Sequence, residues 1–166
     1  MTAFRIALAN VRHPESPDES ITLATRAIAE AGRNRAAILC FPECFVPGYR
    51  GLGNVVPPPD AEFLERAWSI IAEAAGRAGA AVVLGTERLV NGGIIASALV
   101  INSDGSRAGF QDKEQIDPSE EGTYTPGSGD FSDEGQPGIV LRIVSFDDRE
   151  ERLLERTRDR ARLAAT

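Results

Sequence analysis

Apolar residues recur along this chain with two different periods, which predict alternating strands and helices. Short apolar runs at 4–10, 36–41 and 81–85 are typical of buried strands, because the central ones carry apolar side chains on both faces. Between these runs, residues 19–31 and 60–79 place their apolar side chains at helical spacing. The order predicts a βαβαβ unit in which helices cover parallel strands.

Residues at the ends of the apolar stretches mark where the two helices begin and end. Asp18 and Asp60 precede them and are the predicted N-caps, because a carboxylate can accept hydrogen bonds from the free N–H groups of a first turn. Gly32 and Gly79 follow them and are predicted to end the helices.

The pattern changes after the third strand. Two alternating segments, 94–101 and 107–112, flank an Asp104-Gly105 turn and predict an antiparallel hairpin. Residues 139–146 predict one more strand, and 147–162, with acids and arginines interspersed, predict a solvated helix. The fold class expected is α/β, with a mixed sheet flanked by helices.

Length and charge narrow the class of protein. The 166 residues suit one domain, and the net charge of −7 gives no electrostatic support to a nucleic-acid role. No apolar run approaches the roughly 20 residues of a membrane span, and the N-terminus lacks the features of a signal peptide. Two cysteines are too few for a disulfide framework, so we expect a reducing cytoplasm and no membrane partner.

Two charged residues stand where chemistry is expected in an α/β sheet. Glu43 directly follows the second strand, in FPECFVPGY, and Lys113 follows the hairpin, in QDKEQIDPSEEGTYTPG. Lys113 is the single lysine among 18 basic residues. Catalytic groups in such folds gather beyond the carboxyl ends of strands, where a carboxylate and an ammonium can serve as base and oxyanion stabiliser. A structural ion pair, or a surface lysine retained by chance, is the alternative.

Three stretches, FPECFVPGY, SALVINSDGSRAG and DKEQIDPSEEGTYTPG, resemble in this order the nitrilase superfamily of carbon–nitrogen hydrolases. The resemblance implies a four-layer αββα fold and a glutamate, lysine and cysteine triad that hydrolyses a small nitrile or amide. Glu43 matches the general base and Lys113 the lysine that stabilises the tetrahedral intermediate. A second family glutamate falls on Glu120, with Glu121 as the alternative. The resemblance implies no metal and no organic cofactor.

The family pattern breaks at the nucleophile. SFDDR looks like the family's cysteine segment with Ser145 in place of the cysteine. A serine hydroxyl is a far weaker acid than a thiol, so we expect little or no hydrolase activity from this chain. The resemblance also decays from residue 129, and the chain stops where the family continues. We therefore expect a partial domain over 1–166 with a divergent part at 129–166, either a true cysteine-to-serine variant or out-of-frame sequence.

Other reactive side chains have simpler interpretations. Cys44 should face away from Glu43, since successive residues of an extended chain point in opposite directions, and is expected to be a buried, inert thiol rather than a substitute nucleophile. Cys40, inside the strand, should lie in the core. His13 is expected on the surface. The acids around Lys113 lack the spacing of a calcium loop. Core positions are expected for two aromatic residues of the second helix, Phe63 and Trp68.

A partial sandwich has a physical consequence. One face of the sheet would stay uncovered as an apolar patch, so we expect self-association or dependence on a partner. The alternative to a hydrolase is a non-catalytic domain that binds a small molecule or takes part in assembly.

Overall fold

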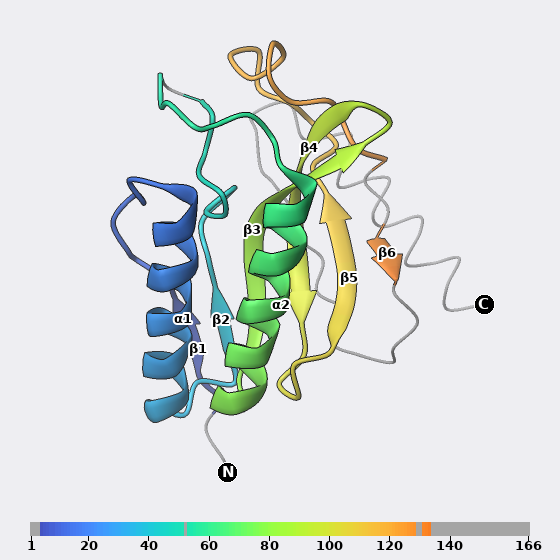
Figure 1. Ribbon diagram of the computed structural model, residues 1–166. Coiled ribbons are helices and arrows are strands. Elements are labelled where there is room, and N and C mark those ends of the chain that lie inside the picture. Colours follow the sequence, from blue (N-terminus) through green and yellow to red (C-terminus); the bar gives the residue numbers. More distant parts are fainter. Residues whose placement is uncertain (1–3, 52, 129–130, 134–166) are drawn as a thin grey trace, which may run out of the picture.

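The computed structural model describes residues 4–51, 53–128 and 131–133, which form one six-stranded sheet and two helices (Figure 1). The elements in chain order are β1 (Ile6–Leu8), α1 (Pro17–Arg33), β2 (Ile38–Cys40), α2 (Ala61–Ala78), β3 (Ala81–Val90), β4 (Gly93–Ile101), β5 (Arg107–Asp112) and β6 (Phe131–Asp133). The α/β class and the mixed sheet are confirmed.

The strands follow one another across the sheet in sequence order. β1, β2 and β3 run parallel, and each later strand pairs antiparallel with the one before it. β5 therefore runs in the same direction as β2 and β3. Because of this, the loops that follow β2 and β5 leave the sheet at the same end of the strands, at the top of Figure 1.

The start of α1 differs from the prediction. Ser16, not Asp18, is the N-cap, and its side chain accepts a hydrogen bond from the backbone N–H of Glu19. Pro17 occupies the first turn, where its missing N–H costs no hydrogen bond, and this sets the start two residues earlier. Asp18 lies in the first turn, where its charge favours the helix dipole.

Of the two glycines predicted to end helices, only Gly79 does so. Gly32 does not end α1, which continues to Arg33 and is capped by Asn34. A Cβ at Gly32 would lie 2.9 Å from the Cβ of Ala78 in α2, so this glycine allows the helices to approach. Asp60 caps α2 and Gly79 ends it in a left-handed conformation, as predicted.

β3 is longer than predicted. It continues past Gly85 to Val90 and forms a hairpin with β4 through Asn91 and Gly92, which both have positive φ. Asn-Gly is the strongest sequence signal for such a turn. The prediction missed it because Thr86, Glu87 and Arg88 interrupt the apolar run.

The predicted β4–β5 hairpin is confirmed, whereas β1 and β2 are shorter than their apolar runs. β6 was not predicted. The strand expected at 139–146 and the helix expected at 147–162 lie outside the described residues.

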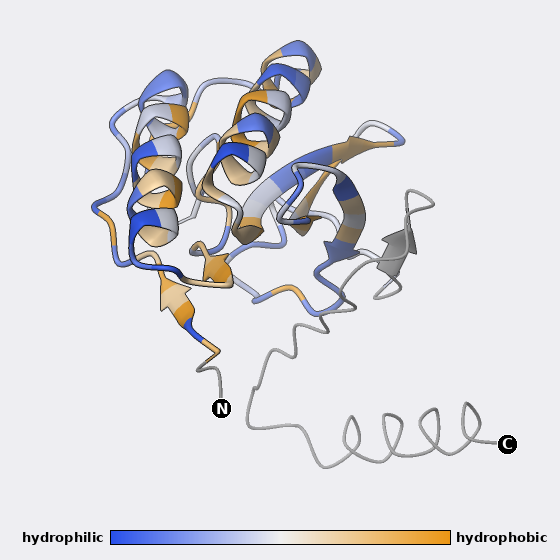
Figure 2. Ribbon diagram, turned by 90° about the horizontal axis from the view of Figure 1, so that it is seen from below, coloured by the Kyte–Doolittle hydropathy of each residue, from blue (hydrophilic) through white to orange (hydrophobic). Residues whose placement is uncertain are grey.

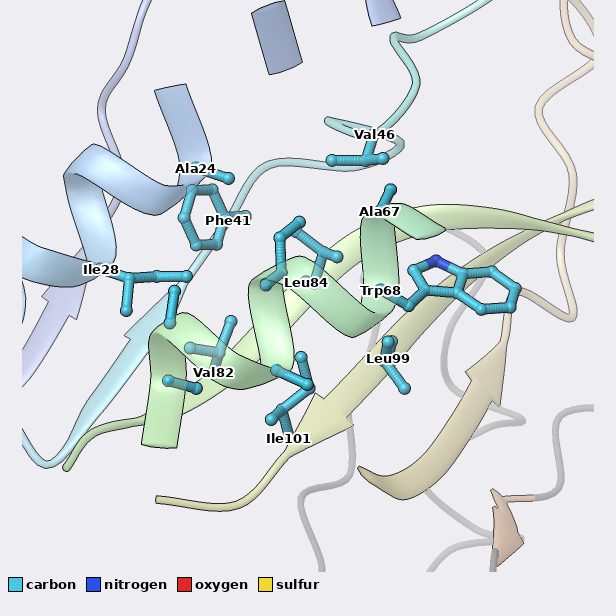
Figure 3. Close-up of a cluster of buried hydrophobic side chains, with 14 of the residues drawn as sticks. Ala24, Ile28, Phe41, Val46, Ala67, Trp68, Val82, Leu84, Leu99 and Ile101 are labelled. Carbon is cyan, nitrogen blue, oxygen red and sulfur yellow. The ribbon is translucent and has the colours of Figure 1, made fainter. Parts of the chain in front are cut away.

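The main core lies between the helices and one face of the sheet (Figures 2 and 3). Figure 3 shows Leu84 and Leu99 of the sheet beside Trp68 of α2, whose indole N–H donates to the buried hydroxyl of Thr86 over 3.0 Å. Phe63 and Trp68 are both buried, as predicted. This packing fixes α2 against β3, which in turn supports the loop that follows β2.

Candidate active site

The segment that carries Glu43 is held against β3 by backbone hydrogen bonds on both sides of it. The N–H of Phe41 donates to the carbonyl of Val83 over 2.9 Å, and the N–H of Val46 to that of Gly85 over 3.2 Å. Between these anchors the chain turns, and Glu43 extends from the turn with a side chain that is 47% exposed. The carboxylate is therefore both accessible and fixed in place.

Lys113 is held with similar rigidity at the end of β5. Its N–H donates to the carbonyl of Ala96 over 2.9 Å, and its carbonyl accepts from Gly127 over 2.8 Å. The ammonium lies 2.8 Å from Oε1 of Glu43 and 2.7 Å from Oε2 of Glu120. The structure thus brings together three of the four residues singled out in the sequence, and the fourth, Ser145, lies outside the described residues.

Glu120, rather than Glu121, is the second carboxylate of this cluster. Glu120 is only 3% exposed, whereas Glu121 is exposed. Besides the Lys113 ammonium, Glu120 accepts hydrogen bonds from the hydroxyl of Tyr49 at 2.7 Å and the backbone N–H of Asp117 at 3.1 Å. Three donors therefore fix one buried carboxylate.

The charges of Lys113 and Glu120 stabilise each other. Burial favours the neutral form of each, but their mutual hydrogen bond and the other contacts of the cluster outweigh it. The pKa of Lys113 is raised and the pKa of Glu120 is lowered from their ordinary values. Both groups are therefore charged at neutral pH.

The two carboxylates differ in what they can do. Glu120 is buried and its charge is used by three donors, which suits a group that orients the ammonium. Glu43 is half exposed and can take a proton from an incoming molecule. Two of the three N–H bonds of the ammonium are directed at these carboxylates, so the third can face an oxygen that gains negative charge.

Cys44 is buried, as predicted, although the expected reason was wrong. The chain is not extended there, since Cys44 has a φ of 43° in the left-handed region. Its thiol donates to the carbonyl of Thr86 over 3.4 Å. Burial raises the pKa of Cys44 to about 12, so this thiol cannot supply a thiolate at neutral pH.

Sequence reasoning missed several residues that build the site. Tyr49 and Tyr124 were part of quoted motifs without an assigned role, yet their rings stack 6.2 Å apart beside the cluster. The hydrogen bond to Glu120, with burial, raises the pKa of Tyr49 to about 12, which keeps its phenol protonated as a donor. Arg50 and Glu87 form a buried ion pair next to Tyr49. No sequence spacing connects Glu87 with the loop it contacts.

The remaining predictions concern isolated side chains. His13 is exposed, and Cys40 is only partly buried. Within residues 4–51, 53–128 and 131–133, no group of three His, Cys, Asp or Glu side chains is arranged to hold a metal ion. No helix of this part of the chain has the length and hydropathy needed to cross a membrane.

Comparison with protein families gives a match to the carbon–nitrogen hydrolase model over residues 5–144. The match ends directly before Ser145. A search of curated proteins found no match.

Solved structures of amidases share the fold. An amidase from Nesterenkonia sp. is 26% identical, with a TM-score of 0.64 over 75% of this chain and 48% of its own. A variant of the same amidase, solved after Michael addition of acrylamide at its active-site cysteine, is 25% identical over 76% of this chain and 50% of its own, with a TM-score of 0.64. A carbon–nitrogen hydrolase from Helicobacter pylori, 19% identical with a TM-score of 0.64 over 75% of this chain and 45% of its own, shares the fold alone. The chain spans about half the length of these proteins.

Proposed function

The chain belongs to the carbon–nitrogen hydrolase family of the nitrilase superfamily, and from this premise we propose that its site is built to hydrolyse a small amide or nitrile but has lost its nucleophile. The observation that carries the proposal is the contact of the Lys113 ammonium with both Glu43 and Glu120. The amidase neighbours favour a short amide as the substrate class.

The proposed roles follow from exposure and hydrogen bonding. Glu43 is the base that would remove the proton from a nucleophilic thiol, because it is accessible. The sulfur would attack the amide carbon, and the ammonium of Lys113 would stabilise the oxygen as it becomes negative. Glu120 positions the ammonium. The carbon–nitrogen bond would then break, ammonia would leave with a proton from Glu43, and water would hydrolyse the thioester.

Ser145 stands where we place the missing thiol. A glutamate base can remove the proton from a thiol far more easily than from a serine hydroxyl, because the hydroxyl is the weaker acid. We therefore propose that this chain, as it stands, has little or no activity. The alternative origin of residues 129–166, out-of-frame sequence, gives the same expectation.

The test is to restore the thiol. Ser145→Cys should release ammonia from short primary amides, while the unchanged chain should release little. Ser145→Cys combined with Lys113→Met is the control and should be inactive. Equal ammonia release by the unchanged chain would contradict the loss of the nucleophile, and an active control would exclude Lys113 from the reaction.

A second candidate is a non-catalytic domain that assembles with a second copy of itself. Phe4, Ile6 and Leu8 are 67%, 62% and 78% exposed. Ala7 and Ala9 pack toward the helices, so Ile6 and Leu8 point to the opposite face of the sheet. β1 also lies at the end of the sheet with β2 as its described partner. An antiparallel β1–β1 contact between two copies would pair the edge and bring the two apolar strips side by side on one continuous sheet.

We also propose a cytoplasmic location, for which the support is chemical. Cys40 and Cys44 are both free thiols, which is the usual state in a reducing compartment.

A further inference from the structure

Arg50 and Glu87 form a two-pronged ion pair in the protein interior. Nε of Arg50 donates to Oε2 of Glu87 over 2.8 Å, and Nη2 donates to Oε1 over 2.7 Å. The side chains are 10% and 0% exposed, respectively. The hydrogen bonds to Glu87, against the effect of burial, raise the pKa of Arg50. This parallel geometry fixes the direction of the guanidinium as well as its position.

Arg50 also ties together segments that are distant in the sequence. Its Nη1 donates to the carbonyl of Pro57 over 2.7 Å and to that of Val56 over 3.3 Å. Its backbone N–H donates to the hydroxyl of Tyr124 over 3.2 Å. One arginine therefore joins β3, through Glu87, to the later part of the loop after β2 and to the loop after β5.

The residue before Arg50 reaches the candidate active site directly. The Tyr49 hydroxyl donates to one oxygen of Glu120, and the other oxygen of Glu120 accepts from the Lys113 ammonium. A shift of the backbone at Arg50 would thus move Tyr49 and change the position of Glu120. Among the hydrogen bonds and ion pairs of the described residues, none joins Arg50 or Glu87 to Lys113 directly. The connection runs through Tyr49 and Glu120.

We propose that Arg50 and Glu87 are positioning residues, which hold Tyr49 on Glu120 and so set the hydrogen bonding of the Lys113 ammonium. The inference rests on the proposed function only because that function makes Lys113 the group whose hydrogen bonding matters. The competing explanation is purely structural: Glu87 is buried and needs a cation, whatever happens at Lys113. The two explanations differ in what they expect when both charges are removed together.

The single lysine of the chain makes the site directly measurable. Lysine-selective isotope labelling gives one side-chain signal, which belongs to Lys113. An N-hydroxysuccinimide ester at pH 8 acetylates amines, and Lys113 carries the one lysine amine of the chain, which peptide mass separates from the α-amino group. Because only the neutral amine reacts, an ammonium that loses its contact with Glu120 should react faster.

Four variants of the full chain decide between the explanations. Tyr49→Phe and Glu87→Gln should each shift the Lys113 signal in the same direction and raise its acetylation rate at least threefold. Ile28→Val changes a buried core residue of α1 that is distant in sequence from Arg50 and Glu87, and it is the control for lowered stability. It should leave the Lys113 signal and its acetylation rate unchanged.

The decisive variant replaces both charges by apolar groups of similar size, Arg50→Met with Glu87→Leu. Removing both charges avoids an unpaired buried ion, so the urea midpoint should recover relative to Glu87→Gln. Positioning predicts that the Lys113 signal and its acetylation rate stay altered in this double variant. A return of both to wild-type values, or no change in Glu87→Gln, would overturn the proposal. Neither readout requires hydrolysis, so an inactive Ser145→Cys variant would not affect the result.

Discussion

Gly85 offers the sharpest test of how the Glu43 segment is supported. A Cβ at this position would lie 2.7 Å from the carbonyl carbon of Pro42 and 2.9 Å from the backbone nitrogen of Cys44, and closer still to the carbonyl oxygen of Pro42. Carbon atoms that are not bonded pack at about 3.5 Å or more, so the carbonyl carbon alone requires a shift of about 0.8 Å in Gly85→Ala, and the closer oxygen requires more. The obstacle is backbone, which cannot rotate away as a side chain would.

This shift should cost both stability and site geometry. Overpacking of this kind lowers the free energy of unfolding by about 1 to 3 kcal/mol. It also moves Glu43, which lies between the two contacted residues, away from Lys113. Urea unfolding measures the first effect, and the side-chain signal of Lys113 at pH 7 measures the second.

Gly122→Ala is the matched control. A Cβ there meets no atom within 4 Å, and its φ is outside the left-handed region. We expect this variant to retain the wild-type unfolding free energy to within about 0.5 kcal/mol. If Gly85→Ala behaved in the same way and left the Lys113 signal unchanged, the close approach of β3 to the Glu43 turn would not support the site.

Three further predictions concern other parts of the molecule. Ile6→Thr with Leu8→Thr should reduce self-association in sedimentation velocity. The control is Val55→Thr, which removes an apolar side chain that is 97% exposed on a loop and should have no such effect. A monomeric wild type would contradict the β1 contact. Because the pKa of Glu120 is lowered in the folded state, its stabilising contribution is present above the unfolded pKa, about 4.3, and is lost as the pH falls through the folded value. The free energy of unfolding of Glu120→Gln at pH 6 should therefore be about 2 kcal/mol lower than that of wild type. Urea titrations should show this difference shrinking below about pH 4. The thiol of Cys44 should resist a disulfide reagent in the folded chain and react in urea; fast reaction without urea would show that it is accessible.

The fold was predictable where a local pattern and its burial agree. Asp60 and Gly79 have the same roles in the structure as in the sequence, because capping depends on a few neighbouring atoms. Ser16 was missed in favour of Asp18, although Pro17 between them marks the first helical position. The end of β3 was missed because Thr86 and Glu87 are polar and yet fully buried. Their burial depends on partners in other elements, Trp68 and Arg50, which no local pattern reveals.

The candidate site divides in the same way. The contact of Glu43 with Lys113 could be inferred from strand direction, since the carboxyl ends of β2 and β5 lie at the same end of the sheet. The choice of Glu120 over Glu121 could not, because the loop that carries them has no regular period. It is settled by three donors that converge on one side chain.

Within the part of the chain that the structure describes, the contacts that orient Lys113 come from residues 43–127. Glu43 is held by β3, Glu120 by Tyr49 and Asp117, and the ammonium by both carboxylates, so none of these contacts involves a residue beyond 128. The orientation of the lysine and the supply of a nucleophile are therefore separate physical problems. A chain can lose the second while the first stays intact, since the buried charge of Glu120 still needs its donors for folding. This is why the ammonium of Lys113, rather than hydrolysis, is the direct measure of whether the site persists.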